Sequence, residues 1–246
     1  QILQSLPQAI QTMLDPADCG PACLSLCQDV QGETFEYPEE FFKERVHNIR
    51  RPKPDDFQIK QAVERIKNSK NPIIISGGGV FYSDAMEELS NFAVKHNIPV
   101  TQTVMGYSTM KRDHSHFVGP IGGLGGKAAN NLAKETDLAI CIGTKLADFT
   151  TGSWANFENP QFKLVSINIA RHDANKHLAE AVIGDAKVSL IELSNALGDW
   201  RSSDSWHKKS QDELKSWNEY VDKESGPTNQ ELPSYAHAVG AIYRNS

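Results

Sequence analysis

The sequence predicts an α/β fold with a mostly parallel sheet of five to six strands, and three observations lead to this prediction. Short apolar runs have the character of strands, and the clearest, Ile73–Ile75, shows no polar alternation, as expected where both faces are covered. Segments with apolar residues at helical spacing separate the runs. Three glycines, Gly77–Gly79, follow the clearest run, where a strand would turn into a helix. The alternation indicates βαβ units, and hence a Rossmann-like three-layer domain with extended N- and C-terminal linker segments.

The predicted strands occupy five runs, and amphipathic helices lie around them. The runs are 72–76, 98–103, 138–142, 164–169 and 181–183. Asp55 or Asp56 can cap the helix before the first run, and Ser83 can cap the helix after it. The stretch 119–137 begins with glycines and ends in a helix, and helices are also predicted near 190–197 and over 204–222. The apolar positions that define the helices are Ile59, Ala62, Val63, Ile66, Met86, Leu89, Ala93, Ala128, Leu132, Ala133, Leu190, Leu193, Leu197, Leu214, Trp217 and Val221.

The first 56 residues are predicted to lack a core of their own. Residues 1–31 contain a helical start and an apolar run, Ala22–Cys27, that is interpreted as a strand. Residues 32–56 have the composition of a linker, with three prolines and a charged middle. Four aromatic side chains in this linker are expected to dock on another surface: Phe35, Tyr37, Phe41 and Phe42.

Composition and charge exclude several classes of function. The net charge is −6 and no run of Lys and Arg stands out, which argues against a nucleic-acid partner. No apolar run approaches the roughly 20 residues of a membrane span, and the first residues do not match a signal peptide. A cytoplasmic location is therefore expected. Of the four cysteines, Cys19, Cys23 and Cys27 lack the C-x-x-C spacing of a metal site, so buried, reduced thiols are favoured.

The strand, the three glycines and the following helix match a nucleotide-binding turn only in part. Gly77 and Gly79 fit the first two glycines of G-x-G-x-x-G, but Tyr82 stands in the third place. Gln102 ends the next strand, where an NAD site would need an acid, so an ordinary NAD site is disfavoured. Two interpretations stay open: a tight turn in a parallel sheet, and a loop that approaches a ligand phosphate. Loops 77–79, 103–107, 143–151 and 168–173 should share one edge of the sheet and form a cleft there.

No convincing set of catalytic groups is found in the chain. His114 and His116 have no cysteine or carboxylate cluster at a recognisable metal spacing, which disfavours a zinc site. Ser153 lacks the context of a nucleophile elbow. Aspartates at strand and loop edges are better explained by turns and caps.

Several segments in order resemble one family, the thiamine-diphosphate-dependent enzymes of the acetolactate-synthase type. LPQAIQTMLDPADCGPACLSLCQDVQ is similar to the close of their first domain, and NPIIISGGGVFYSDAMEELSNFAVKHNIPVTQTVMG to the start of their central domain. GPIGGLGGKAANNLAKETDLAICIGTKLADFTTGSW and VIGDAKVSL continue that domain. The resemblance implies four parts: residues 1–31, the tail end of the N-terminal pyrimidine-binding domain; 32–56, a linker; 57–199, the central nucleotide-fold domain; and 200–246, a linker toward the C-terminal diphosphate-binding domain.

The resemblance places the catalytic groups and the metal ligands in the two neighbouring domains. Thiamine diphosphate and Mg²⁺ are then bound mainly outside this chain, and the chain alone is expected to be inactive. YPEEFFKERVHNIRRPKPD and GGGVFYSDA most resemble members that open a small cyclic diketone by hydrolysing a carbon–carbon bond. The alternative is the central FAD- or ADP-binding domain of a carboligase or decarboxylase. A structural role at subunit interfaces is also considered, and a homo-oligomer, dimer or tetramer, is expected.

Flavin-containing members hold their dinucleotide at positions that the resemblance carries over to this chain. The implied cofactor-binding residues are Gly78, Gly79, Met105, Gly106, Gly122, Gly123 and Asn168. Lys145 and Phe149 stand where those members have arginines, and Asn168 begins the segment where they have I-D-I-D. Loss of an acid and of bidentate arginines weakens a flavin site, so a vestigial or differently used cleft without a redox role is expected.

Overall fold

The computed structural model describes residues 1–245 and divides the chain into two compact units, residues 1–52 and residues 53–246. The first unit contains α1 (Ile2–Leu14) and two short 3₁₀ helices, η1 (Val30–Gly32) and η2 (Glu39–Phe42). The helical start predicted at the N-terminus is confirmed. The strand predicted over Ala22–Cys27 is wrong, because this segment is irregular and has no neighbouring strand to pair with.

Side chains of the first unit are mostly exposed, which corrects a second prediction. Cys19, Cys23 and Cys27 are exposed thiols, whereas Cys141 in the second unit is buried. These three thiols are not buried, because the irregular segment that carries them forms no hydrophobic core. Tyr37 contacts the rings of Phe35, Phe41 and Phe42 at 5.0–5.9 Å between ring centroids. The aromatic residues thus pack on one another, and Phe42 remains 71% exposed.

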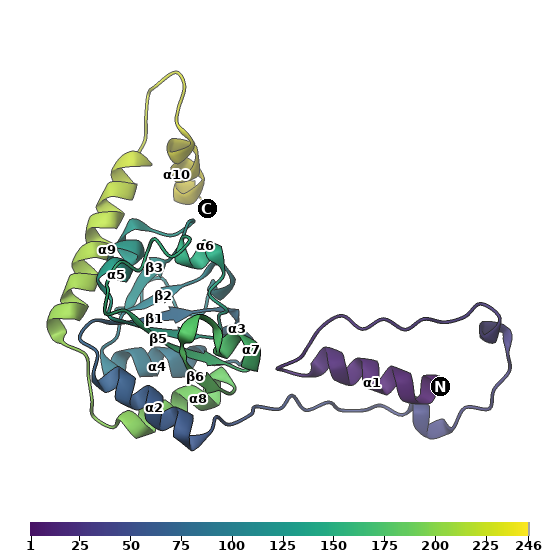
Figure 1. The fold of residues 1–246 in the computed structure, drawn as a ribbon. Helices are drawn as coiled ribbons and strands as arrows, with labels where there is room; N and C mark the ends of the chain where they lie inside the picture. The colour runs from purple at the N-terminus through teal and green to yellow at the C-terminus, as the bar shows by residue number, and fades with distance from the viewer. Residues whose placement is uncertain (246) are drawn as a thin grey trace. The chain divides into compact units, whose positions relative to one another are not determined.

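The second unit is built on a single sheet of six parallel strands, which confirms the predicted fold class (Figure 1). The strand order is β3-β2-β1-β4-β5-β6. The strands are β1 (Pro72–Ser76), β2 (Val100–Gln102), β3 (Phe117–Pro120), β4 (Leu138–Ile142), β5 (Lys163–Asn168) and β6 (Glu180–Ile183). The sequence did not predict β3, whose four residues include a glycine and a proline, both poor strand formers. This strand sits at the edge of the sheet, where proline is tolerated.

Helices cover both faces of the sheet. The elements of this unit are α2 (Asp56–Lys67), α3 (Gly78–Tyr82), α4 (Met86–His96), η3 (Val104–Gly106), α5 (Lys127–Glu135), α6 (Asp148–Thr151), α7 (Arg171–Ala174), η4 (Lys176–Leu178), α8 (Ala186–Leu197), α9 (Asp204–Glu224) and α10 (Tyr235–Asn245). Helix α8 packs against α2 and α4, and α5 packs against α9 (Figure 1). Ile74 belongs to the core beneath α2, α4 and α8, whereas Ile73 and Ile75 belong to the core beneath α5 and α9. The alternation of one strand between two cores explains why its sequence is apolar throughout.

Of the two helix caps predicted near β1, one is confirmed and the other is wrong. The Asp55 carboxylate accepts a hydrogen bond from the Phe57 amide at 2.8 Å and caps α2. Ser83 does not cap a helix start. It ends α3 instead, and α4 begins after Ala85 without a side-chain cap, since Asp84 adopts a left-handed conformation that separates the two helices.

Helix α9 is joined to the sheet by one buried indole. Trp206 is 3% exposed, and its Nε1 donates a hydrogen bond to the Pro72 carbonyl at 2.8 Å. Leu214 and Trp217 pack against the same core, as the predicted apolar stripe required. Residues 206–217 therefore belong to the packed unit, while the division of the chain at residue 200 stays a prediction.

Candidate functional site

The loops that follow the strands meet at the carboxyl edge of the sheet, on either side of the point where the strand order reverses. This reversal lies between β1 and β4, and ligands of open α/β sheets bind in the crevice at such a point. All seven predicted cofactor-binding residues lie at this edge: Gly78 and Gly79 after β1, Met105 and Gly106 after β2, Gly122 and Gly123 after β3, and Asn168 at the end of β5. The parallel topology thus brings together residues that are 90 positions apart in the chain.

At the reversal itself the bare glycines are in contact with each other. The Gly79 amide donates a hydrogen bond to the Gly143 carbonyl at 2.9 Å. A Cβ on Gly79 would lie 2.6 Å from the Gly143 Cα, and Gly143 has a φ of +61°. The loops after β1 and β4 therefore touch through their backbones, and this packing alone requires glycine at both positions.

Gly106 and Gly122 are also explained by packing. A Cβ on Gly106 would lie 2.2 Å from the Ser76 carbonyl oxygen, and one on Gly122 would lie 2.0 Å from the Phe149 carbonyl oxygen. The Phe149 oxygen also accepts a hydrogen bond from the Gly123 amide at 2.7 Å. These contacts support the interpretation of tight turns at both loops.

Gly123 and Gly78 have less crowded surroundings than the glycines described above. The nearest atoms to a Cβ on Gly123 would be in Phe149 at 3.8 Å, which is ordinary contact. A Cβ on Gly78 would lie 3.1 Å from the Met105 carbonyl oxygen. Packing within the chain therefore leaves room for a side chain at Gly123 and does not require glycine there.

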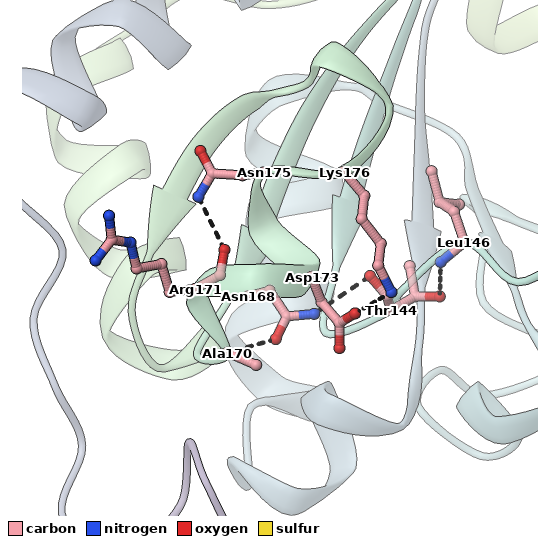
Figure 2. Close-up of polar contacts among 8 residues, drawn as sticks. All are labelled: Thr144, Leu146, Asn168, Ala170, Arg171, Asp173, Asn175 and Lys176. Atoms are coloured by element: carbon pink, nitrogen blue, oxygen red, sulfur yellow. Dashed lines mark hydrogen bonds and ion pairs between the residues drawn. The ribbon is translucent and has the colours of Figure 1, made fainter.

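Asn168 connects the loops after β4 and β5 (Figure 2). Its Nδ2 donates to the Thr144 carbonyl at 3.3 Å, and its Oδ1 accepts from the Ala170 amide at 3.0 Å. On the same loop, Lys176 and Asp173 form an ion pair at 2.5 Å. Both ends of the Asn168 amide are used in holding the loops, so the residue acts first as a structural link at this edge.

Exposed apolar side chains project at the same edge of the sheet, and of these the sequence analysis named only Met105 as a candidate binding residue. Seven of them are more than half exposed, and we call them the apolar rim: Phe81, Tyr82, Val104, Met105, Tyr107, Leu124 and Phe149. They follow β1, β2, β3 and β4, which are neighbours in the sheet. Exposed apolar patches of this kind mark binding surfaces. The signal was present in the sequence as apolar residues inside predicted loops.

The charged groups of residues 1–245 do not assemble into a metal centre. No three His, Cys, Asp or Glu side chains in this part of the chain are grouped so that they could hold a metal ion. His116 is buried and stacks on His207 at 4.2 Å between ring centroids, with His114 nearby. Burial, reinforced by the neighbouring His207, His114 and Arg201, lowers the pKa of His116 to about 4. Burial likewise raises the pKa of the Cys141 thiol, which is therefore unreactive.

None of the described helices combines the length and the apolar character needed to cross a membrane.

Comparison with known proteins identifies the fold family. The family model described as "Thiamine pyrophosphate enzyme, central domain" matches residues 59–193. The chain is similar to 3D-(3,5/4)-trihydroxycyclohexane-1,2-dione hydrolase of Clostridium perfringens (strain 13 / Type A), with 42% identity over 89% of this chain and 34% of the relative. Hydrolase 1 of the same name from Bacillus cereus (strain ZK / E33L) is 44% identical over 82% of this chain and 32% of the relative. The chain thus spans about a third of the length of these curated relatives. On these findings, and as its sequence motifs predicted, the chain belongs to the family of thiamine pyrophosphate enzyme central domains.

Proposed function

We propose that this chain is the central domain of a thiamine-diphosphate-dependent hydrolase of inositol breakdown, which opens the ring of trihydroxycyclohexane-1,2-dione by hydrolysing a carbon–carbon bond. One observation carries the proposal. The similarity to the Clostridium perfringens hydrolase runs over 219 residues, well beyond the segment 59–193 that the family as a whole shares. Sequence outside the common fold is therefore also similar to hydrolases of that name.

The role proposed for this domain is that of a scaffold. Thiamine diphosphate supplies carbanion chemistry when bound, and a diphosphate with its Mg²⁺ needs a cluster of oxygen ligands. Among the described residues, no three His, Cys, Asp or Glu side chains are grouped so that they could hold a metal ion. In line with the resemblance to the three-domain family, we assign the cofactor, the metal and the catalytic groups to polypeptide other than this chain. The domain sets the spacing between the domains that carry the catalytic groups. The protein is a cytoplasmic homo-oligomer in which a neighbouring surface packs on the apolar rim.

A second candidate is the FAD- or ADP-binding central domain of an acetolactate-synthase-like carboligase or decarboxylase. The observation in its favour is the strand order, since a sheet ordered 3-2-1-4-5-6 is a known dinucleotide-binding frame. The contacts of Gly79, Gly106 and Gly122 weigh against it, because packing within the chain already accounts for glycine at these positions without a ligand.

The test is an assay of the protein expressed from the whole gene, with trihydroxycyclohexane-1,2-dione as substrate. We expect ring opening that requires both thiamine diphosphate and Mg²⁺, and none from the 246-residue chain alone. Ring opening that persists without the cofactor and the metal would refute the proposal. The same preparation should leave pyruvate unchanged, since carboligation of a ketoacid is the signature of the second candidate. Calorimetric titration of the 246-residue chain with FAD and with ADP completes the comparison, and saturable heat with either would favour the second candidate.

A further inference from the structure

Three histidines lie together where α9 begins, and we call them the histidine cluster. His114 and His116 come just before β3, and His207 belongs to the first turn of α9. The rings of His116 and His207 stack at 4.2 Å between centroids, with 24° between their planes. The His114 ring lies 5.8 Å from that of His116, which is buried. The histidine cluster is therefore a contact between the start of α9 and the amino edge of the sheet.

Hydrogen bonds satisfy His114 and His116 in their neutral forms. The His116 amide donates to Nδ1 of His114 at 3.1 Å, and this nitrogen can accept only while it carries no proton. Since an amide oxygen only accepts, Nε2 of His116 donates to Oδ1 of Asn97 at 3.3 Å. Its Nδ1 then accepts from the Ser115 hydroxyl at 3.0 Å. Each ring thus has one donating and one accepting nitrogen, as a neutral imidazole does.

His207 has no acceptor for a second proton. Its Nδ1 is buried and has no hydrogen-bond partner among residues 1–245. A protonated ring would bury an unpaired donor there and would place a charge against the stacked ring of His116. The other charged or titratable groups that face the stack are His114, Arg201 and Asp204. Burial lowers the pKa of both stacked rings, and the Asp204 carboxylate opposes this effect only at His207.

The same hydrogen-bond network attaches the segment that precedes α9. Asn97, which accepts from His116, donates through its Nδ2 to the Ser202 carbonyl at 3.2 Å. The same Nδ2 donates to the Asp204 carboxylate at 3.1 Å. Residues 199–207 are therefore bound to the sheet through His116 in two ways, by the ring stack and by Asn97.

The segment 199–207 lies between a glycine and a packed part of α9. Gly198 has a φ of +63°, and nothing beyond its chain neighbours lies within 4 Å of where a Cβ would be, so the backbone has room to turn there. Further along α9, Leu214 and Trp217 pack against the core independently of the histidines. Movement of the segment thus does not require the rest of α9 to leave the sheet. We propose that the histidine cluster is an acid-sensitive attachment, and that protonation of its rings releases residues 199–207 while the sheet stays folded.

Hydrogen exchange of single amides, measured by NMR on the 246-residue chain at pH 7.0 and 4.5, tests the proposal. The amides of Ser202, Trp206 and His207 are hydrogen-bonded in the attached state. After correction for intrinsic exchange, we expect their protection to be about a hundredfold lower at pH 4.5. The reason is that a histidine pKa lowered from 6.5 to about 4 favours the released state by roughly that factor. The Ile74 amide on β1 reports opening of the whole unit and should stay better protected at both pH values.

The double variant H116Q/H207Q should lose most of this pH dependence, because glutamine does not titrate in this range. The control H172Q, at an exposed histidine, should keep it in full. Protection of Ser202 and Trp206 equal to that of Ile74 would show that the segment opens only with the whole unit, and would overturn the proposal. Protection that does not change with pH, or full pH dependence in the double variant, would overturn it as well. The comparisons made on the unchanged chain do not depend on the folding of the variants.

Discussion

Individual glycines at the carboxyl edge have different reasons for being glycine. Gly79 and Gly143 touch through their backbones, whereas Gly123 has room for a side chain. In the sequence these residues look alike, as members of Gly-rich loops. The structure separates the glycines that packing requires from Gly123, where packing leaves room for a side chain.

The contrast between Gly79 and Gly123 can be measured. We expect Gly79→Ala to lower the free energy of unfolding by about 1–3 kcal/mol or more, because the new methyl group collides with backbone that cannot move aside. Gly123→Ala should leave it unchanged or raise it by up to about 1 kcal/mol, since alanine restricts the unfolded chain. Urea denaturation of both variants gives the comparison. Equal losses in the two variants would contradict the packing argument.

The pKa of His116 makes the stability of the second unit depend on pH. Its ordinary value is 6.5 and burial lowers it to about 4, so the unfolded chain binds a proton that the folded chain refuses. Stability is therefore intact above about pH 6.5 and falls as the pH drops toward 4, by about 3 kcal/mol in total. The neighbouring His207, whose pKa burial also lowers, adds to the same slope.

Urea denaturation between pH 7.5 and 4.5 tests this dependence. His116→Gln should flatten the curve, because glutamine does not titrate in this range. The exposed His172 provides the matched control, and His172→Gln should leave the slope unchanged. A slope as steep in the His116 variant as in the unchanged chain would refute the assignment, since His207 alone should leave only a shallower one.

At the scale of elements, α9 is held to the sheet by Trp206 and by the histidine stack. Ser203 caps the helix by accepting from the Trp206 amide at 3.2 Å. His207, one residue later, stacks on His116 just before β3. The start of α9 is thus attached to the sheet by several independent contacts. The later residues of the helix extend beyond these contacts.

The indole hydrogen bond should account for part of this attachment. Trp206→Phe removes the donor to the Pro72 carbonyl and leaves that buried oxygen without it, which costs about 1–3 kcal/mol. Trp217→Phe, on the same helix, loses ring area but no hydrogen bond with the described residues, so its loss should be smaller. Thermal unfolding of the two variants checks the order. Equal shifts in Tm would show that ring packing, not the hydrogen bond, holds the helix.

At the scale of the whole molecule, the most unusual surface is the apolar rim. Side chains such as Met105, Tyr107 and Phe149 are 69–76% exposed on loops that a parallel sheet places side by side. Water is a poor solvent for such a patch, so a partner surface is expected there.

The rim predicts self-association of the chain. We expect light scattering after size-exclusion chromatography to give a mass that rises with concentration. Met105→Glu with Phe149→Glu should shift the chain toward the monomer, because a buried charge opposes the contact. Val94→Glu, an exposed apolar position on α4, is the control and should not change the mass. A chain that stays monomeric at every concentration would contradict this role of the rim.

The sequence by itself determined the order of strands and helices, the parallel sheet and the family. These follow from local signals: Ile73–Ile75 are apolar in a row, and Ile59, Ala62, Val63 and Ile66 repeat at helical spacing. Where local signals were weak, at β3 and at Ala22–Cys27, the prediction failed. The tertiary structure alone decided which glycines are forced, where the apolar rim lies and how the rings of His116 and His207 come to stack. The physical reason is that these properties depend on contacts between segments distant in the chain, and periodicity within a segment carries no record of them.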